Sequence, residues 1–152
     1  MTDPETETPP TITIEQVDGY RFMVDFAGLG PQLLVDEAPP IGLGEGPYPE
    51  QLLTAGVANC LCASLVFALG KFRQDAGRLS ARATCRVGRN EAGRLRVHGI
   101  DVEITLGAPA AGLDRIDRVL EQFERFCTVS ESVQAGVPVT VGVRDVLGQR
   151  LK

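Results

Sequence analysis

One long apolar stretch constrains this chain more than any other feature. No residue between Leu52 and Leu69 is charged, and the residues there are apolar or small on almost every face of a helix. Pro49 suits the first position of that helix, where a backbone N–H would have no partner anyway. A helix that is apolar all round is buried rather than amphipathic. We therefore predict a buried central helix from Pro49 to about Gln74, wrapped by sheet.

The same stretch also meets the length requirement for a membrane span. Its 18 uncharged residues reach the number that can cross a bilayer. However, Thr54, Asn59 and Ser64 make it only mildly hydrophobic, and a span there would leave two halves without a complete core. A central helix in a protein core is the better interpretation, and we expect no membrane partner.

The composition is that of a globular protein with an acidic surface. The 152 residues fit one domain that can bury a substantial core, and the net charge is −5. There is no tryptophan, and only Lys71 and Lys152 are lysines. An acidic chain without a basic stripe argues against nucleic acid as a partner.

The first ten residues are acidic and rich in threonine and proline, a composition typical of a disordered tail. They have no positively charged segment followed by an apolar run, so they do not form a secretory signal. We expect a cytoplasmic protein, in which cysteines are reduced or catalytic rather than a disulfide framework. The predicted domain then covers residues 11–152.

Short alternating segments predict the other elements. We expect strands at 11–16, 20–26, 32–36, 79–87, 95–106 and 137–145, and helices at 113–126 and between Cys127 and Gly136. The strands at 79–87 and 95–106 alternate polar and apolar residues, which predicts one buried and one wet face. The order predicts an α+β fold with a mainly antiparallel sheet.

Two of the four cysteines are placed where chemistry is possible. Cys60 lies in the middle of the apolar helix, and Cys127 lies at a helix junction, where free N–H groups and the helix dipole can stabilise a thiolate. A thiol near a second thiol can be oxidised to a sulfenic acid and then resolved as a disulfide. The alternative is simple packing, because free cysteines are commonly buried, and spacing alone favours that alternative.

Two groups of residues carry a resemblance to a known family. The first is PEQLL at 49–53 with ANCL at 58–61, and the second is FCTVS at 126–130 with GVPV at 136–139. In these motifs the chain resembles the OsmC/Ohr family, the osmotically inducible and organic-hydroperoxide-resistance proteins. The similarity extends over most of the chain, including the order of strands and helices.

The resemblance implies an OsmC-like fold, an intertwined homodimer and a peroxidase activity. It makes Cys60 the peroxidatic thiol, Cys127 the resolving thiol and Glu50 the acid near the active site. It implies organic hydroperoxides as substrates and dithiols or lipoyl groups as reductants, with no cofactor. The alternative function is a non-catalytic protein on the same dimeric fold that binds a small apolar ligand or senses redox state.

The chain departs from the peroxidase members at their active-site arginine. Those proteins carry an arginine upstream of the glutamate, and Arg21 is the only arginine before Glu50 here. A carboxylate without its cation raises the pKa of a nearby thiol. We therefore predict that Arg21 takes this place, with Arg73 and Arg125 as alternatives. If no arginine does so, we expect the peroxidase activity to be weak.

The remaining candidates have less specific interpretations. We expect Cys62 and Cys85 to pack in the core or sheet. His98 has no clustered partners that would make a metal site with it. The glycine-rich segment 42–46 predicts a flexible lid rather than a phosphate cradle, because no P-loop lysine follows it.

Overall fold

The structure is a computed structural model that describes residues 8–136. The described chain divides into two compact units. One comprises residues 8–55 together with Ala83–Asp101, and the other comprises Gly56–Arg82 together with residues 102–136. The strand predicted at 137–145 and most of the predicted tail lie outside the described residues.

The first unit begins with a three-stranded antiparallel meander. Its strands are β1 (Thr13–Asp18), β2 (Arg21–Asp25) and β3 (Leu33–Val35), in that spatial order. Gly19 makes the turn between β1 and β2 with a φ of 47°, a value that glycine adopts without steric cost. The predicted meander is confirmed, with strand ends displaced by one or two residues.

Helix α1 (Pro49–Lys71) is the long helix expected from the apolar stretch. Its start is closed by the Gln51 side chain, which accepts from the Tyr48 N–H at 2.9 Å. The helix ends at Lys71 rather than Gln74, because the next residues form a turn in which the Gln74 N–H bonds back to the Leu69 carbonyl. The central helix is therefore confirmed, and the predicted end is three residues too late.

The helix is only partly buried within a single copy of the chain. One side is buried, with Leu65 and Leu69 only 2% and 3% exposed, but Val66 and Phe67 on another side are 57% and 55% exposed. Burial of the helix on all sides therefore stays a prediction. By length and composition α1 could cross a membrane, although this is weak evidence because core helices meet the same criteria.

The second unit contains the main apolar core. Val119 of helix α2 (Ile116–Gln122) is fully buried there. The buried members of the core come from α1, α2 and the connecting segments: Leu65, Ala68, Leu69, Ala76, Leu113 and Val119.

The helix predicted at 113–126 is divided in the structure. The 3-10 turn η1 (Ala110–Gly112) precedes α2, and the 3-10 turn η2 (Phe123–Phe126) follows it. Two features interrupt a continuous helix at its start: Arg115 has a φ of 58°, and the Asp114 N–H donates to the Gln74 side chain at 3.0 Å. The apolar residues of this segment nevertheless face the core, as their spacing predicts.

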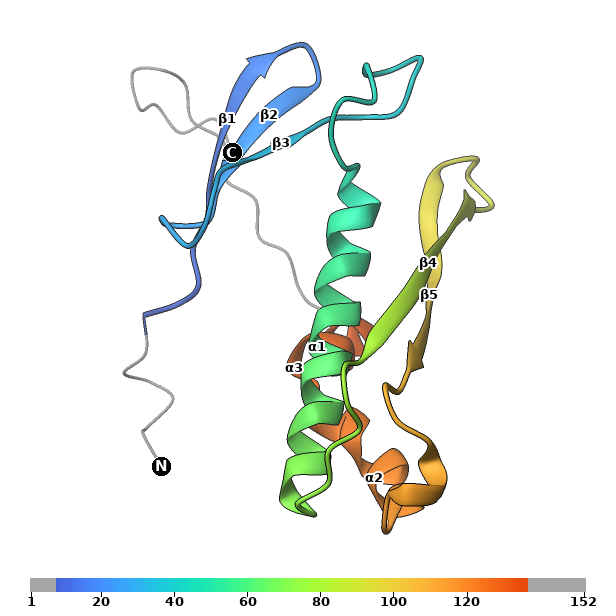
Figure 1. The fold of residues 1–152 in the computed structure, drawn as a ribbon. Helices are drawn as coiled ribbons and strands as arrows, with labels where there is room; N and C mark the ends of the chain where they lie inside the picture. The colour runs from blue at the N-terminus through green and yellow to red at the C-terminus, as the bar shows by residue number, and fades with distance from the viewer. Residues whose placement is uncertain (1–7, 137–152) are drawn as a thin grey trace. The chain divides into compact units, whose positions relative to one another are not determined.

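Strands β4 (Ser80–Arg89) and β5 (Leu95–Thr105) form a hairpin that Figure 1 shows as antiparallel. Their residues alternate as predicted, but the inward-facing positions reach only half-burial, and Leu95 is 57% exposed. Within this chain the expected buried face is thus incompletely covered. Arg86 and Asp101 pair across the strands at 2.6 Å.

Candidate active site

Cys127 occupies the N-terminus of helix α3 (Thr128–Ala135). It is the N-cap residue, and its Sγ accepts a hydrogen bond from the Ser130 N–H at 3.3 Å. The side chain is fully buried. The first N–H groups of a helix have no partner within the helix and carry a partial positive charge. Cys127 therefore lies where a sulfur atom receives donors from the backbone.

Cys60 lies on α1, and the neighbouring Cys127 thiol is the first of the groups that lower its pKa. The Cys60 residue is half-buried. Further donors to it are the backbone N–H groups of Val129 and Ser130 and the hydroxyl of Ser64. The two thiols that the sequence placed 67 residues apart thus meet inside the second unit.

These surroundings shift the pKa values of the two thiols in opposite directions. Burial raises the pKa of Cys60, but hydrogen bonds from Cys127, from the α3 N–H groups and from Ser64 outweigh burial, so its pKa lies below that of an ordinary thiol. Burial and the hydrogen bond with Cys60 raise the pKa of Cys127. A thiolate accepts hydrogen bonds from a neutral thiol, so the arrangement favours Cys60 as the charged partner and Cys127 as the donor.

Such a pair has the chemistry of an oxidisable dithiol. The thiolate is the nucleophilic form of cysteine, and Cys60 is both the more acidic and the more exposed of the two. After the first sulfur is oxidised, a neighbouring thiol can attack it and form a disulfide. Among residues 8–136, no arginine is one of the groups that lower the pKa of Cys60.

Arg21 has other partners in the first unit. Its guanidinium pairs with Asp18 and, at 2.5 Å, with Glu45. Hydrogen bonding to Arg21 lowers the pKa of Asp18. No ion pair between Arg21 and Glu50 is present within residues 8–136. The predicted Arg21–Glu50 pair is therefore not formed in this chain, and a part for Arg21 in catalysis stays a prediction.

Glu50 lies in the first turn of α1 and lines a cavity of about 750 Å³ within the first unit. A cavity of this size can hold a small organic molecule. Its walls come from the loop before α1, the start of α1 and the β4–β5 hairpin. The lining residues are Glu37, Ala38, Pro39, Pro40, Ile41, Tyr48, Glu50, Gln51, Thr54, Ala55, Ala83, Thr84, Cys85, Val87 and Leu95.

Asp36 anchors the loop that forms one wall of this cavity. It is 2% exposed, and its carboxylate accepts from the N–H groups of Glu37, Leu43 and Glu45 at 2.7, 3.0 and 3.1 Å. Burial raises the pKa of Asp36, but these backbone N–H groups hold it below the usual value. Gly42 is required here, because a Cβ would lie 2.3 Å from the Glu37 carbonyl oxygen. The segment predicted to be a flexible lid is thus tied to a buried carboxylate.

Two polar residues beside the thiols were not predicted to be functional. Ser64 and Ser130 are each 6% exposed, and both supply hydrogen bonds at the thiol pair. Their spacing contained a signal. Ser64 is four residues after Cys60, on the same helical face, and Ser130 is three residues after an N-cap, where an N–H usually bonds to the cap side chain.

The other cysteines and the histidine do not join the thiol pair. Cys85 lines the cavity of the first unit, and Cys62 is half-buried on α1. His98 is exposed on β5. Across residues 8–136, no three His, Cys, Asp or Glu side chains are grouped so that they could hold a metal ion.

Comparison with known proteins agrees with this architecture. The family model of the OsmC-like proteins matches residues 42–142, more than half of the chain. The matched segment includes both Cys60 and Cys127. No curated protein matches the sequence.

Several solved structures have the same fold at low sequence identity. An OsmC-like protein of unknown function from Vibrio cholerae has a TM-score of 0.68 and 15% identity over 84% of this chain and 95% of its own. An organic hydroperoxide resistance protein from Elizabethkingia anophelis has a TM-score of 0.65 and 19% identity, covering 87% of this chain and 92% of its own. The organic hydroperoxide resistance protein OhrB of Bacillus subtilis has a TM-score of 0.63 and 17% identity, covering 85% and 93%.

Proposed function

The chain belongs to the OsmC-like protein family, and on that premise we propose that it reduces organic hydroperoxides through Cys60 and Cys127. The observation that carries the proposal is the hydrogen-bonded thiol pair, in which a half-buried Cys60 has a lowered pKa. Structural relatives that are organic hydroperoxide resistance proteins support the choice of substrate.

The proposed reaction has three steps. The Cys60 thiolate attacks the outer oxygen of the hydroperoxide; an S–O bond forms, the O–O bond breaks, and the alkoxide takes up a proton to leave as an alcohol. The sulfur of Cys127 then attacks the Cys60 sulfenic acid, forming the disulfide and releasing water. An external dithiol, small or lipoyl, finally reduces the disulfide and is itself oxidised to a disulfide.

The neighbours of Cys60 suit the first step. Burial alone would favour the neutral thiol, which is a poor nucleophile. The N–H groups of Val129 and Ser130 and the Ser64 hydroxyl offset that effect. In this proposal the N-terminus of α3 provides the positive potential that an arginine provides in peroxidase members, and Arg21 and Glu50 remain candidates for a supporting part.

Consumption of cumene hydroperoxide with dithiothreitol or a lipoyl dithiol as the reductant tests the proposal. We expect turnover in the wild type and none in Cys60→Ser. Cys127→Ser should still be oxidised once at Cys60 and then fail to form the disulfide. Peptide mapping after mild peroxide treatment should find Cys60 linked to Cys127, with Cα atoms about 4.4–6.8 Å apart in the oxidised form.

The controls lie in the other two cysteines. Cys62→Ser and Cys85→Ser should keep turnover, because neither residue is among the hydrogen-bond partners of Cys60. A disulfide from Cys60 to Cys62 or Cys85 would contradict the assignment. Absence of hydroperoxide consumption with either reductant would end the enzyme proposal.

The cavity of the first unit favours a second candidate, a small-ligand-binding protein. Its lining is mainly apolar, with prolines, Ile41, Val87 and Leu95 among the wall residues. Binding of a neutral apolar fluorescent probe would be expected, and Ala83→Phe, in the lining, should abolish it by filling the space. Probe binding combined with absent peroxide turnover would favour this candidate over the enzyme.

We also propose that the protein is a homodimer. Apolar side chains remain uncovered in the single chain on α1 and β5, including Val66 at 57%, Leu95 at 57% and Leu53 at 39% exposure. A second copy would remove such surface from water, which is favourable. Sedimentation velocity at micromolar concentration should show a dimer, and a stable monomer would contradict the proposal.

A further inference from the structure

The segment that carries Cys127 is held against α1 by an aromatic contact at the surface. Phe126, the residue before Cys127, packs edge to face on Phe67 of α1, with ring centroids 5.4 Å apart and an interplanar angle of 73°. The Lys71 ammonium lies over both rings, 4.8 Å from the centroid of Phe67 and 4.3 Å from that of Phe126. These three residues, which we call the aromatic clamp, join the two segments that supply the thiols.

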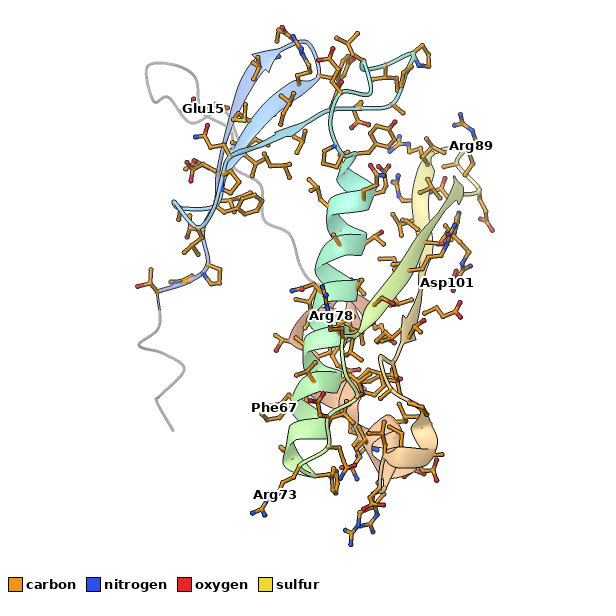
Figure 2. All side chains as sticks on the ribbon, viewed as in Figure 1. Glu15, Phe67, Arg73, Arg78, Arg89 and Asp101 are labelled. Carbon is orange, nitrogen blue, oxygen red and sulfur yellow. The ribbon has the colours of Figure 1, made fainter. Side chains whose placement is uncertain are left out.

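The clamp lies outside the apolar core. Phe67 and Phe126 are 55% and 41% exposed, and Figure 2 shows Phe67 on the outer side of α1. Phe123, at the other end of η2, packs instead against the core cluster. The 3-10 turn is thus held at its first residue by the core and at its last residue by the clamp. Only the second of these attachments lies next to a reactive sulfur.

We propose that Phe67, Phe126 and Lys71 are positioning residues that keep Cys127 at Cys60 and so determine how readily the two thiols form a disulfide. The inference rests on the thiol pair of the proposed function but does not depend on the hydroperoxide being the oxidant. The three side chains do not act by touching the reacting sulfur atoms. They act through the backbone between Phe126 and Cys127.

The physical argument is one of effective concentration. A disulfide between two groups that are already held together has less conformational freedom to remove than one between groups that move apart. The clamp docks η2 on α1 before oxidation, and the disulfide requires the same docked arrangement. The clamp and the disulfide therefore stabilise each other. Loosening the clamp should leave the reduced protein with more conformations and make the disulfide harder to form.

Lysine is suited to this place for two reasons. A cation over an aromatic face is attracted by the ring even at an exposed site, and here one ammonium serves two rings. Its methylene groups cover apolar ring surface while the charge stays in water. Lys71→Met keeps most of the apolar stem and removes the charge, and Lys71→Arg keeps a cation that can lie over the rings.

The test is the thiol–disulfide equilibrium of the protein in dithiothreitol buffers. In this exchange the Cys60–Cys127 disulfide gains two electrons and two protons from dithiothreitol, which closes to its cyclic disulfide. The fraction oxidised is read by acid quenching, alkylation and mass spectrometry. We expect Lys71→Met to lower the equilibrium constant for disulfide formation about three- to tenfold. This corresponds to a reduction potential of the Cys60–Cys127 disulfide that is about 14–30 mV less negative.

Two variants complete the design. Lys71→Arg should return the constant to within about twofold of the wild type. Arg118→Met removes an exposed cation of α2 in the same unit and should leave the equilibrium constant unchanged. Phe126→Leu keeps an apolar side chain but loses the ring, and it should lower the constant at least as much as Lys71→Met.

An unchanged or raised equilibrium constant in Lys71→Met would overturn the inference, as would an equal fall in Arg118→Met. Failure of the wild type to form a Cys60–Cys127 disulfide in oxidised dithiothreitol would overturn it as well. Failure of the proposed function has a different signature, since a protein that consumes no hydroperoxide can still show this equilibrium and its dependence on Lys71.

Discussion

Ser64 offers a direct test of what makes Cys60 reactive. Ser64→Ala removes a buried hydroxyl that helps the other donors to hold the pKa of Cys60 down against the effect of burial. With fewer donors to the charged sulfur, that pKa should rise and less thiolate should be present at neutral pH. The reaction of Cys60 with electrophiles should then slow.

The expected size follows from the number of donors and the exposure of the sulfur. A hydrogen bond to a charged group contributes roughly 1.5–3 kcal/mol in general. Cys60 is half-buried and keeps its donors from Cys127, Val129 and Ser130, so solvent screening reduces the loss to about 0.5–1 kcal/mol. This corresponds to a roughly two- to fivefold smaller thiolate population at pH 7.

The assay is the alkylation rate of Cys60 by iodoacetamide, followed by peptide mass spectrometry so that each cysteine is read separately. Because the pKa of Cys60 is lowered, its thiolate should persist below about pH 8.5, where a free cysteine is already half protonated. The wild-type rate should fall only as the pH falls through the lowered pKa. In Ser64→Ala that fall should begin at a higher pH, and the two proteins should react equally in strong alkali.

Thr54→Ala is the matched control. Thr54 is also a buried hydroxyl on α1, but it donates to the Glu50 carbonyl at 2.6 Å and is not among the donors to Cys60. Its loss should leave the alkylation rate of Cys60 unchanged. Equal rates for Ser64→Ala and wild type at pH 7, or the same slowing in Thr54→Ala, would refute the hydrogen-bond explanation.

Three further predictions concern the core, the arginine and the anchored loop. Leu65→Ala should destabilise the protein by roughly 2–5 kcal/mol in denaturant unfolding, while Leu120→Ala, 46% exposed, should cost much less. If the N-terminus of α3 is enough to lower the pKa of Cys60, Arg21→Met should change the alkylation rate of Cys60 less than twofold. A slowing of about fivefold or more would show that Arg21 also stabilises the thiolate. Asp36→Asn should lower the melting temperature at pH 7. Because the pKa of folded Asp36 is lowered, its stabilisation is present above the unfolded value and lost as the pH falls through the folded pKa, so the difference between Asp36→Asn and wild type should shrink by pH 3.

Much of the fold was visible in the sequence because it is local. The apolar stretch predicts α1 since uncharged residues over five turns leave few other structures, and the meander follows from strands of alternating residues separated by turns. The helix predicted at 113–126 begins later than expected, where Arg115 has a φ of 58° and the Asp114 N–H bonds to the side chain of Gln74, 40 residues away. Burial on all sides of α1 stays a prediction, because apolar composition does not state which segments or copies of the chain cover a helix.

The candidate site divides in the same way. Periodicity and helix-boundary residues are enough to place Cys60 on a long helix and Cys127 at the start of another. Only the folded chain shows that Ser64 and the α3 N–H groups lower the pKa of Cys60 and that Arg21 pairs with Glu45. The reason is physical: hydrogen bonds and ion pairs depend on distances of a few ångströms between segments far apart in the chain, and no spacing within one segment specifies those distances.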